Sequence, residues 1–184
     1  DPTLQIFGMG GRKLRAVGLE TIIDIETSAA VMGLTEVIGS LGKIFRARRT
    51  LLQAVAERKP ALVILVDFPD FNLWLARGLR GSGARVLYFI SPQLWAWRSG
   101  RVKQIKRDVS QVATIFPFEV DFYHRHGVKA DFVGHPYLDR PALNIKREEF
   151  RESVGLAPQV KTIALLPGSR RAEVTKLLPV MLAA

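Results

Sequence analysis

Three polar side chains follow one of the most apolar runs of the sequence. Residues 61–66 are all apolar, and such runs form strands that are buried on both faces of a parallel sheet. Asp67, Asp70 and Asn72 come directly afterwards, in a turn that contains Pro69. Open α/β sheets bind ligands at the carboxyl ends of their strands, and carboxylates there can accept protons. The residues therefore indicate acid–base chemistry or, more simply, one Asp that caps the next helix and another that is solvated.

Aromatic and cationic side chains follow the next expected strand. Trp95, Trp97 and Arg98 come shortly after an expected strand at residues 85–90. Indole rings beside a guanidinium can stack on a flat ligand or lie at a membrane interface. The alternative is that at least one of the two tryptophans belongs to the core.

Two further turns carry groups that can bind anions. His135 follows an expected short strand at residues 130–133, where it can act as an acid, a base or a phosphate contact, or as a hydrogen-bonded structural residue. Ser169 and Arg170 lie between an expected strand at residues 161–166 and a helix. A hydroxyl, a guanidinium and helix N–H groups there favour an anion site, and an ordinary turn with a solvated Arg is the alternative.

An amphipathic segment covers residues 31–45. Its apolar residues recur every three or four positions, which is typical of one helix face. That face packs on a core or enters a lipid surface, and cations that follow it can bind lipid head groups. The apolar set is Val31, Leu34, Val37, Ile38, Leu41, Ile44 and Phe45, and the cations are Lys43, Arg46, Arg48 and Arg49.

Expected strands and helices alternate along the chain, which predicts an α/β fold with a doubly wound parallel sheet. A helix is expected to continue over residues 50–59. We expect a first Rossmann-like domain over residues 1–140, a linker and helix over 141–160, and the start of a second such domain over 161–184. The remaining expected strands are residues 4–7 and 109–116, and the remaining helices are 12–17, 71–80, a basic segment after residue 100, 117–126, 147–154 and one from residue 172.

Composition narrows the class of protein further. The 184 residues include 27 Lys and Arg against 17 Asp and Glu, a net charge of +10, which favours anionic partners such as phosphates, nucleic acid or acidic lipid. The absence of Cys excludes disulfides and thiolate metal sites. No apolar run is long enough to span a bilayer. Because the chain starts at Asp1 and ends inside an expected helix, we interpret it as a fragment.

Six segments, in this order, resemble the lipid-A-disaccharide synthase family. The most specific are Asp-Phe-Pro-Asp-Phe-Asn at 67–72 and Trp-Ala-Trp-Arg at 95–98. The others are 31–37, Pro-Phe-Glu at 117–119, Gly-His-Pro at 134–136 and Leu-Pro-Gly-Ser-Arg at 166–170. The resemblance covers nearly the whole chain. It implies a GT-B glycosyltransferase with two Rossmann-like domains, needing no metal or cofactor, peripheral on the cytoplasmic face of the bacterial inner membrane.

The resemblance also implies a reaction and roles for residues. The family joins UDP-2,3-diacylglucosamine to 2,3-diacylglucosamine 1-phosphate with inversion, giving UDP and a β-1,6-linked disaccharide. Asp67 matches the proposed base, with Asp70 as a helix cap or support for it and Asn72 as a contact to sugar hydroxyls. Arg170, assisted by Ser169, would offset charge on UDP, and Arg98 and His135 are secondary substrate contacts. The segment at 31–45 then becomes a membrane contact.

Other interpretations remain at this point. Another GT-B enzyme would share the fold, although Trp-Ala-Trp-Arg argues against it. A non-catalytic basic α/β module that binds nucleic acid would share the charge, but no recognised nucleic-acid motif is present, and nucleic acid is not expected as a partner. The family's first strand and most of its nucleotide-binding domain lie outside the sequence, so we expect the chain by itself to be inactive.

Overall fold

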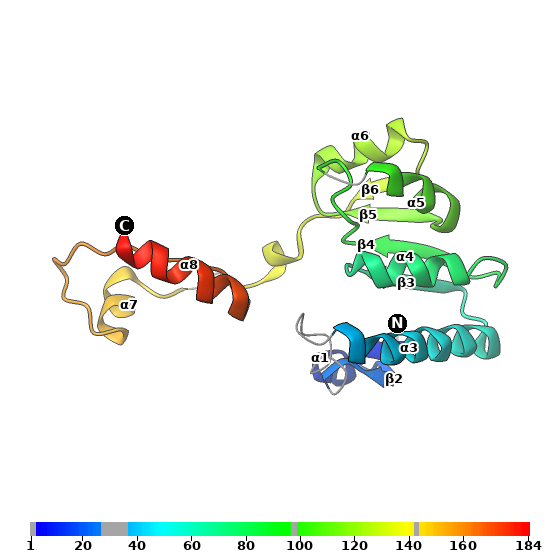
Figure 1. Ribbon diagram of the computed structural model, residues 1–184, viewed down its shortest axis with the longest axis horizontal. Helices are drawn as coiled ribbons and strands as arrows, with labels where there is room; N and C mark the ends of the chain where they lie inside the picture. The colour runs from blue at the N-terminus through cyan, green and yellow to red at the C-terminus, as the bar shows by residue number, and fades with distance from the viewer. Residues whose placement is uncertain (1–2, 27–36, 97–98, 142–143) are drawn as a thin grey trace. The chain divides into compact units, whose positions relative to one another are not determined.

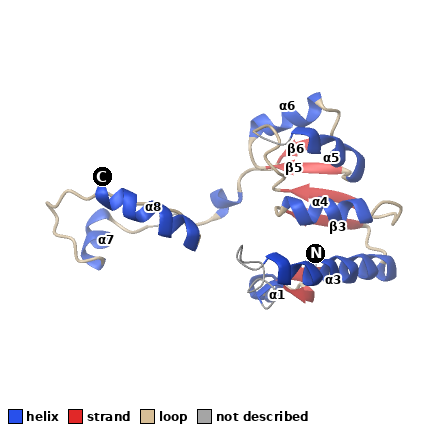
Figure 2. Ribbon diagram, viewed as in Figure 1, coloured by secondary structure: helices blue, strands red, loops and turns tan. Residues whose placement is uncertain are grey.

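The computed structural model of the chain describes residues 3–26, 37–96, 99–141 and 144–184, without the side chains of residues 37–40 and 99. The chain divides into two compact units, Asp1–Arg140 and Pro141–Ala184. All strands of the described residues belong to the first unit (Figure 2). Val31, Leu34 and Arg98 lie outside the described residues, as do the side chains of Val37 and Ile38.

A four-stranded parallel sheet forms the centre of the first unit. Its order is β3-β4-β5-β6, so strands that follow one another in the chain are neighbours (Figure 1). The register places Val66 beside Phe89 and Phe89 beside Ala113, which aligns the carboxyl ends of the strands. This sheet confirms the expected parallel α/β fold. The strands are β3 (Leu62–Val66), β4 (Arg85–Phe89), β5 (Gln111–Thr114) and β6 (Ala130–Phe132).

Helices between these strands build the core. They are α4 (Pro69–Gly78), η1 (Ser99–Arg101), α5 (Val102–Asp108) and α6 (Pro117–Arg125), of which α4 and α5 contact each other. The buried side chains of Leu65, Tyr88 and Val112 form one core cluster with Leu73 of α4 and Ile105 of α5. Burial of such side chains supplies most of the free energy that holds a sheet and its helices together.

One expectation about β3 is wrong. The strand is buried on one face only, since Leu62, Ile64 and Val66 are 48%, 56% and 49% exposed, whereas Leu65 is 3% exposed. Alternate side chains of a strand point to opposite faces. Helices pack on the face that holds Leu65, and none of the described elements covers the other face. A continuous apolar run therefore does not by itself show that both faces are covered within the described chain.

A smaller parallel sheet joins β1 (Phe7–Gly10) to β2 (Glu20–Asp24), with α1 (Arg12–Ala16) between them. The first strand begins where the strand expected at residues 4–7 ends, and the sequence analysis did not predict β2. Arg58 of the neighbouring helix α3 (Val37–Arg58) binds both carboxylate oxygens of Glu20 at 2.6 Å. This bidentate pair holds the small sheet to α3.

Within the described residues, the amphipathic segment and the helix expected to continue over residues 50–59 form one helix, α3. Gly42 lies inside it and does not interrupt it. Ile44, Leu51, Leu52 and Val55 pack on or belong to the core cluster. Tertiary packing of this face therefore overrides the weak helix propensity of glycine.

The second unit contains α7 (Arg147–Ser153) and α8 (Arg171–Ala183). Residues 161–166, expected to form a strand, have no regular secondary structure and pair with no strand among the described residues. Ile163 and Leu166 are more than four-fifths exposed. A strand needs a neighbour to bind its N–H and C=O groups. The assignment of this unit to a nucleotide-sugar-binding domain stays a prediction.

Candidate active site

The turn that follows β3 has an unusual backbone. Asp67 and Phe68 have φ values of 46° and 44°, and Ile90, at the end of the neighbouring strand β4, has a φ of 54°. Residues with a Cβ rarely adopt this left-handed conformation, which costs roughly 1–3 kcal/mol each. Such strain persists only where the surroundings impose it, and it is concentrated at functional sites. Asp67, Phe68 and Ile90 therefore mark the carboxyl ends of β3 and β4 as a candidate site.

Two buried side chains hold this turn in place. The Asn72 amide donates to the carbonyl oxygens of Val66 and Asp67 at 3.0 and 2.7 Å, and the Tyr88 hydroxyl donates to the Asp67 carbonyl at 2.8 Å. Burial raises the pKa of Tyr88, so its hydroxyl keeps the proton that it donates. Asn72 thus binds the backbone beneath Asp67. Its predicted contact with sugar hydroxyls stays a prediction.

The turn opens into a pocket of about 570 Å³. Asp67 is exposed there, and its carboxylate has no hydrogen bond or ion pair among the described residues. Asp70 lies in the first turn of α4, three residues further on, and binds Arg101 Nη2 at 2.5 Å. The two carboxylates therefore differ, because Asp70 shares its charge with a cation, whereas Asp67 can accept a proton from a ligand.

The opposite wall of the pocket is built on a buried carboxylate. Glu119 of α6 is 2% exposed. One oxygen accepts from the Phe116 N–H at 3.2 Å, and the other accepts from Trp95 Nε1 at 3.4 Å. Burial raises the pKa of Tyr123 to about 12, and its hydroxyl donates to the Pro92 carbonyl on the same wall at 3.2 Å. Hydrogen bonds of Glu119 and Tyr123 therefore hold this wall of the pocket from the protein interior.

His135 lies beside this wall. Its ring is 5.8 Å from the Phe116 ring and 5.1 Å from the Tyr137 ring, centre to centre. Nδ1 accepts a hydrogen bond from the Tyr137 N–H at 3.2 Å, at the start of the 3₁₀ helix η2 (Pro136–Asp139). A neutral imidazole bonded in this way carries its proton on Nε2. The neutral ring of His135 can therefore donate a hydrogen bond from Nε2.

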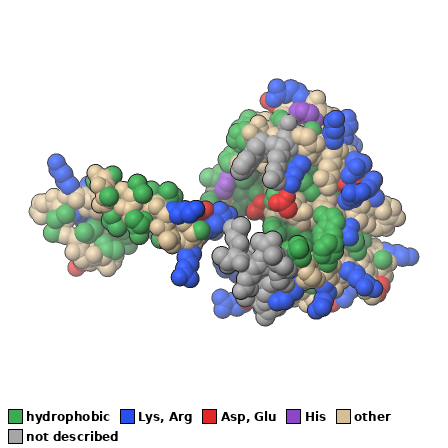
Figure 3. Space-filling view, in the orientation of Figure 1, with side chains coloured by type: hydrophobic (Ala, Val, Ile, Leu, Met, Phe, Trp, Pro, Cys, Tyr) green, Lys and Arg blue, Asp and Glu red, His purple; other side chains and the backbone are tan. Residues whose placement is uncertain are grey.

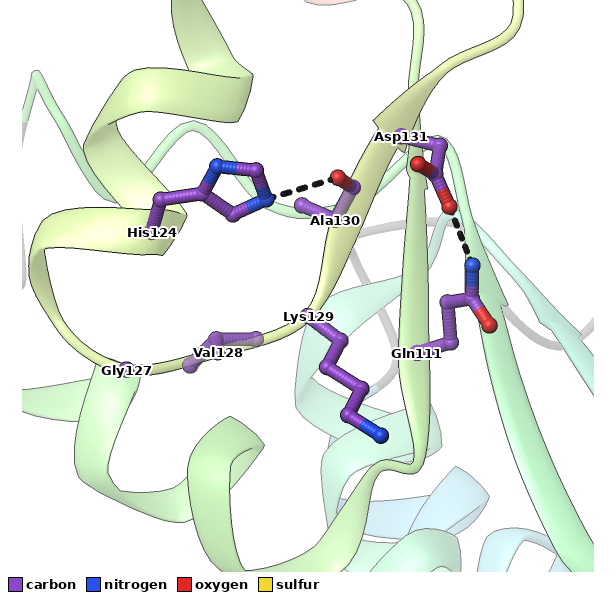
Figure 4. Close-up of a pocket in the computed structure, with 7 residues that line it drawn as sticks. All are labelled: Gln111, His124, Gly127, Val128, Lys129, Ala130 and Asp131. Atoms are coloured by element: carbon purple, nitrogen blue, oxygen red, sulfur yellow. Dashed lines mark hydrogen bonds between the residues drawn. The ribbon is translucent and has the colours of Figure 1, made fainter.

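A second pocket, of about 430 Å³, lies around the beginnings of β5 and β6 (Figure 4). Apart from Lys129, its polar side chains already bind within the protein. Gln111 donates to the Asp131 carboxylate, and His124 Nε2 lies 2.9 Å from the Ala130 carbonyl oxygen. Ligands of open α/β sheets bind at the opposite, carboxyl ends of the strands. The pocket at Asp67 is therefore the better candidate.

In the second unit, the turn before α8 is bound by a carboxylate of that helix, Glu173. Glu173 accepts from the Arg170 backbone N–H at 3.2 Å and pairs with Arg170 Nη1 at 2.9 Å. These bonds hold the pKa of Glu173 below its usual range. Gly168 has a φ of 110°, and a Cβ there would lie 2.5 Å from a Glu173 oxygen. Arg170 remains 72% exposed, so an anionic ligand can reach it beside Ser169.

The predicted membrane contacts on α3 are of two kinds. Ile44 packs on the core, and Arg48 lies over the Trp74 ring at 4.3 Å and donates to the Trp74 carbonyl. Leu41 and Phe45 are exposed, as are Lys43, Arg46 and Arg49. Basic side chains lie mainly along the outer edges of the visible face of the first unit (Figure 3). Among the helices of the described residues, none has the length and hydropathy needed to cross a bilayer.

The sequence analysis missed Arg101 and the role of Glu119. From the sequence, Arg101 belongs to the basic segment expected after residue 100 and has no assigned role. In the structure Arg101 lines the pocket, whereas Arg107 of α5 pairs with the buried Asp108. Glu119 belongs to the Pro-Phe-Glu segment that carried part of the resemblance. A glutamate three residues after the start of a helix was the available signal for its backbone bond.

The fold and the pocket define a class, the parallel α/β proteins whose site lies at the carboxyl ends of the strands. The model of the family described as "Lipid-A-disaccharide synthetase" matches residues 1–184. The chain belongs to this family.

Relatives named lipid-A-disaccharide synthase are similar along nearly the whole chain. The protein from Geobacter sulfurreducens is 51% identical over 182 residues, which are 99% of this chain and 47% of the relative. Those from Geobacter metallireducens and Myxococcus xanthus are 48% and 47% identical, over 99% and 100% of this chain and 47% and 48% of the relatives. The chain thus spans about half the length of the curated relatives it matches.

Proposed function

We propose that the full-length protein carrying this chain is an inverting glycosyltransferase of lipid A biosynthesis. It joins UDP-2,3-diacylglucosamine to 2,3-diacylglucosamine 1-phosphate and releases UDP and the β-1,6-linked lipid A disaccharide 1-phosphate. Membership of the family supports the reaction. The observation that carries the assignment to this site is the strained turn that presents the unpaired Asp67 carboxylate to the pocket.

The proposed chemistry takes place in one displacement. The 6-hydroxyl oxygen of the acceptor forms a bond to the anomeric carbon of the donor while the bond from that carbon to UDP breaks. Asp67 accepts the hydroxyl proton, and UDP leaves with the bonding electron pair. A positioned general base contributes about 10²- to 10⁴-fold to such a step. Asp70, held by Arg101, would fix the geometry of the turn rather than take the proton.

The remaining groups would serve the leaving group and the substrates. Arg170, with Ser169, would bind the diphosphate of UDP, because a guanidinium offsets the charge that develops there. Asn72, Arg98 and His135 are proposed as further contacts to substrate. We propose that the reaction needs no metal and no cofactor, and UDP-sugar is a substrate.

A direct assay tests this proposal. The full-length protein is incubated with both diacylated sugars, UDP release is measured, and the new linkage is examined by NMR. We expect UDP release that depends on the acceptor, and a β-linked disaccharide. Release of UDP without an acceptor, or an α-linked product, would overturn the inverting transfer. The competing proposal of another GT-B enzyme would be supported by transfer to a different acceptor only.

We also propose that the protein binds peripherally to the cytoplasmic face of the bacterial inner membrane. The exposed Leu41 and Phe45 beside exposed cations of α3 support this, since such a surface suits anionic lipid. Neutralising Lys43, Arg46 and Arg49 together should weaken sedimentation with anionic vesicles at least about tenfold, at about 1 kcal/mol per cation. The matched control neutralises Arg77 of α4 and Lys103 and Lys106 of α5, which are exposed as well. Tight binding to duplex DNA with no binding to vesicles would favour the nucleic-acid alternative.

A further inference from the structure

Three aromatic residues form a continuous surface at the mouth of the Asp67 pocket, which we call the aromatic ledge: Trp95, Phe116 and Phe118. The rings of Trp95 and Phe118 meet edge to face at 5.0 Å, and those of Phe118 and Phe116 stack at 5.6 Å. Trp95 and Phe118 are 45% and 49% exposed. Phe116 lines the pocket itself. The ledge thus leads from the outside of the first unit to the site that holds Asp67.

The ledge is held from behind by Glu119. This buried carboxylate binds the Trp95 indole N–H and the Phe116 backbone N–H, so it fixes the two ends of the ledge at once. The rings are therefore preorganised, and a ligand would not have to order them on binding.

The chemistry of the ledge selects an apolar ligand. The Trp95 N–H, the hydrogen-bond donor that its indole ring offers, is already bound to Glu119. Phe116 and Phe118 offer none. A sugar ring that stacked here would leave its hydroxyls without partners from these three side chains. A hydrocarbon chain needs no such partners, and it gains contact with several rings in succession.

We infer that the aromatic ledge binds an acyl chain of the acceptor while the sugar of the same molecule lies in the pocket. This inference rests on the proposed function, which supplies a substrate with a reacting hydroxyl at one end and acyl chains at the other. Continuity with the pocket supports this occupant over a second copy of the chain or another segment of the full-length protein. If either of those two occupants covered the ledge, truncating a ledge residue would not change how kcat/KM depends on the acyl length of the acceptor.

The test compares acceptors of two acyl lengths. The full-length protein is assayed in mixed micelles with one donor and two acceptors whose chains differ by about four methylenes, and kcat/KM is measured for each. Each buried methylene adds about fourfold to binding. We expect Phe118→Ala to lower the ratio of the long to the short acceptor at least about tenfold, the equivalent of two methylenes. Phe118→Leu should give an intermediate ratio.

The matched control is Phe150→Ala, which truncates a phenylalanine of similar exposure, 51%, in the second unit. It should leave the ratio unchanged. If Phe118→Ala keeps the wild-type ratio, or lowers kcat/KM equally for both acceptors, the ledge does not bind the acyl chain, while the proposed function stands. If the wild-type protein uses neither acceptor, the proposed function fails and the inference fails with it.

Discussion

Two turns of this chain have the same local plan and different surroundings. The turn at Asp67 and the turn at Arg170 both follow an apolar run and precede a helix. The first is fixed by Asn72 and by Tyr88 of the neighbouring strand, and it holds two left-handed residues. The second is tied mainly to its own helix through Glu173.

The two kinds of support suit two kinds of charged group, a base and a cation that binds a phosphate. A base must lie within hydrogen-bonding distance of one hydroxyl, so rigid support from a sheet suits Asp67. A cation that binds a diphosphate tolerates movement, and an internal carboxylate can neutralise it until the ligand arrives. Substitutions in the two turns should therefore change different properties. Loss of Arg170 should lower catalysis, whereas loss of Asn72, which supports the Asp67 turn, should lower folding stability.

The largest effect in this comparison is expected at Arg170. In the full-length protein, Arg170→Ala should lower kcat about 10²-fold or more, because charge on the leaving diphosphate loses its partner. The midpoint of urea unfolding should hardly change, since the side chain is mostly exposed. Arg171→Ala, the exposed neighbour in the same helix turn, is the control and should keep nearly full activity. Equal losses in both variants would show a general effect of charge rather than a site at Arg170.

Asn72→Ala should destabilise the Asp67 turn, because the side chain of Asn72 supports its backbone. It removes the donor that satisfies two backbone carbonyls, which should lower the free energy of unfolding by about 2–3 kcal/mol. Ser169→Ala, in the second turn, should change that free energy by less than about 0.5 kcal/mol. Urea denaturation of the full-length protein measures both. Similar losses would mean that the two turns are supported alike.

The smallest effect concerns acid stability outside both turns. The hydrogen bond and charge of Arg58 lower the pKa of Glu20 in the folded protein. A carboxylate with a lowered folded pKa stabilises the protein above its unfolded pKa, and this contribution is lost as the pH falls through the folded value. Arg58→Met should therefore lower the melting temperature slightly at neutral pH. The difference from wild type should shrink in strong acid to the part that comes from the contact of Arg58 with the Phe7 ring at 4.7 Å. A difference that is constant with pH would contradict this pairing.

The sequence predicted the place of Asp67 but not the conformation of its turn. A strand followed by carboxylates is readable because strands and turns have local signatures. A positive φ at Asp67, Phe68 and Ile90 has no such signature, since these residues adopt it only under tertiary constraint. The same holds for Tyr88, whose bond to the Asp67 carbonyl joins residues 21 positions apart.

Other misses have physical causes of the same kind. The role of Arg101 has no local signal, because its partner Asp70 lies 31 residues away in the chain, on α4. The strand at residues 161–166 was expected from its apolar run, but the described residues supply no strand beside it. The mixed polar composition of Glu20–Asp24 concealed a strand that its parallel partner β1 stabilises.

The central claim is that Asp67, and not Asp70, takes the proton. The most direct measurement is the turnover of the full-length protein with Asp67→Asn and with Asp70→Asn, since each change removes one charge and keeps the shape of the side chain. We expect kcat to fall about 10²- to 10⁴-fold for Asp67→Asn, and clearly less for Asp70→Asn. Near-wild-type turnover of Asp67→Asn, or a larger loss in Asp70→Asn, would contradict it.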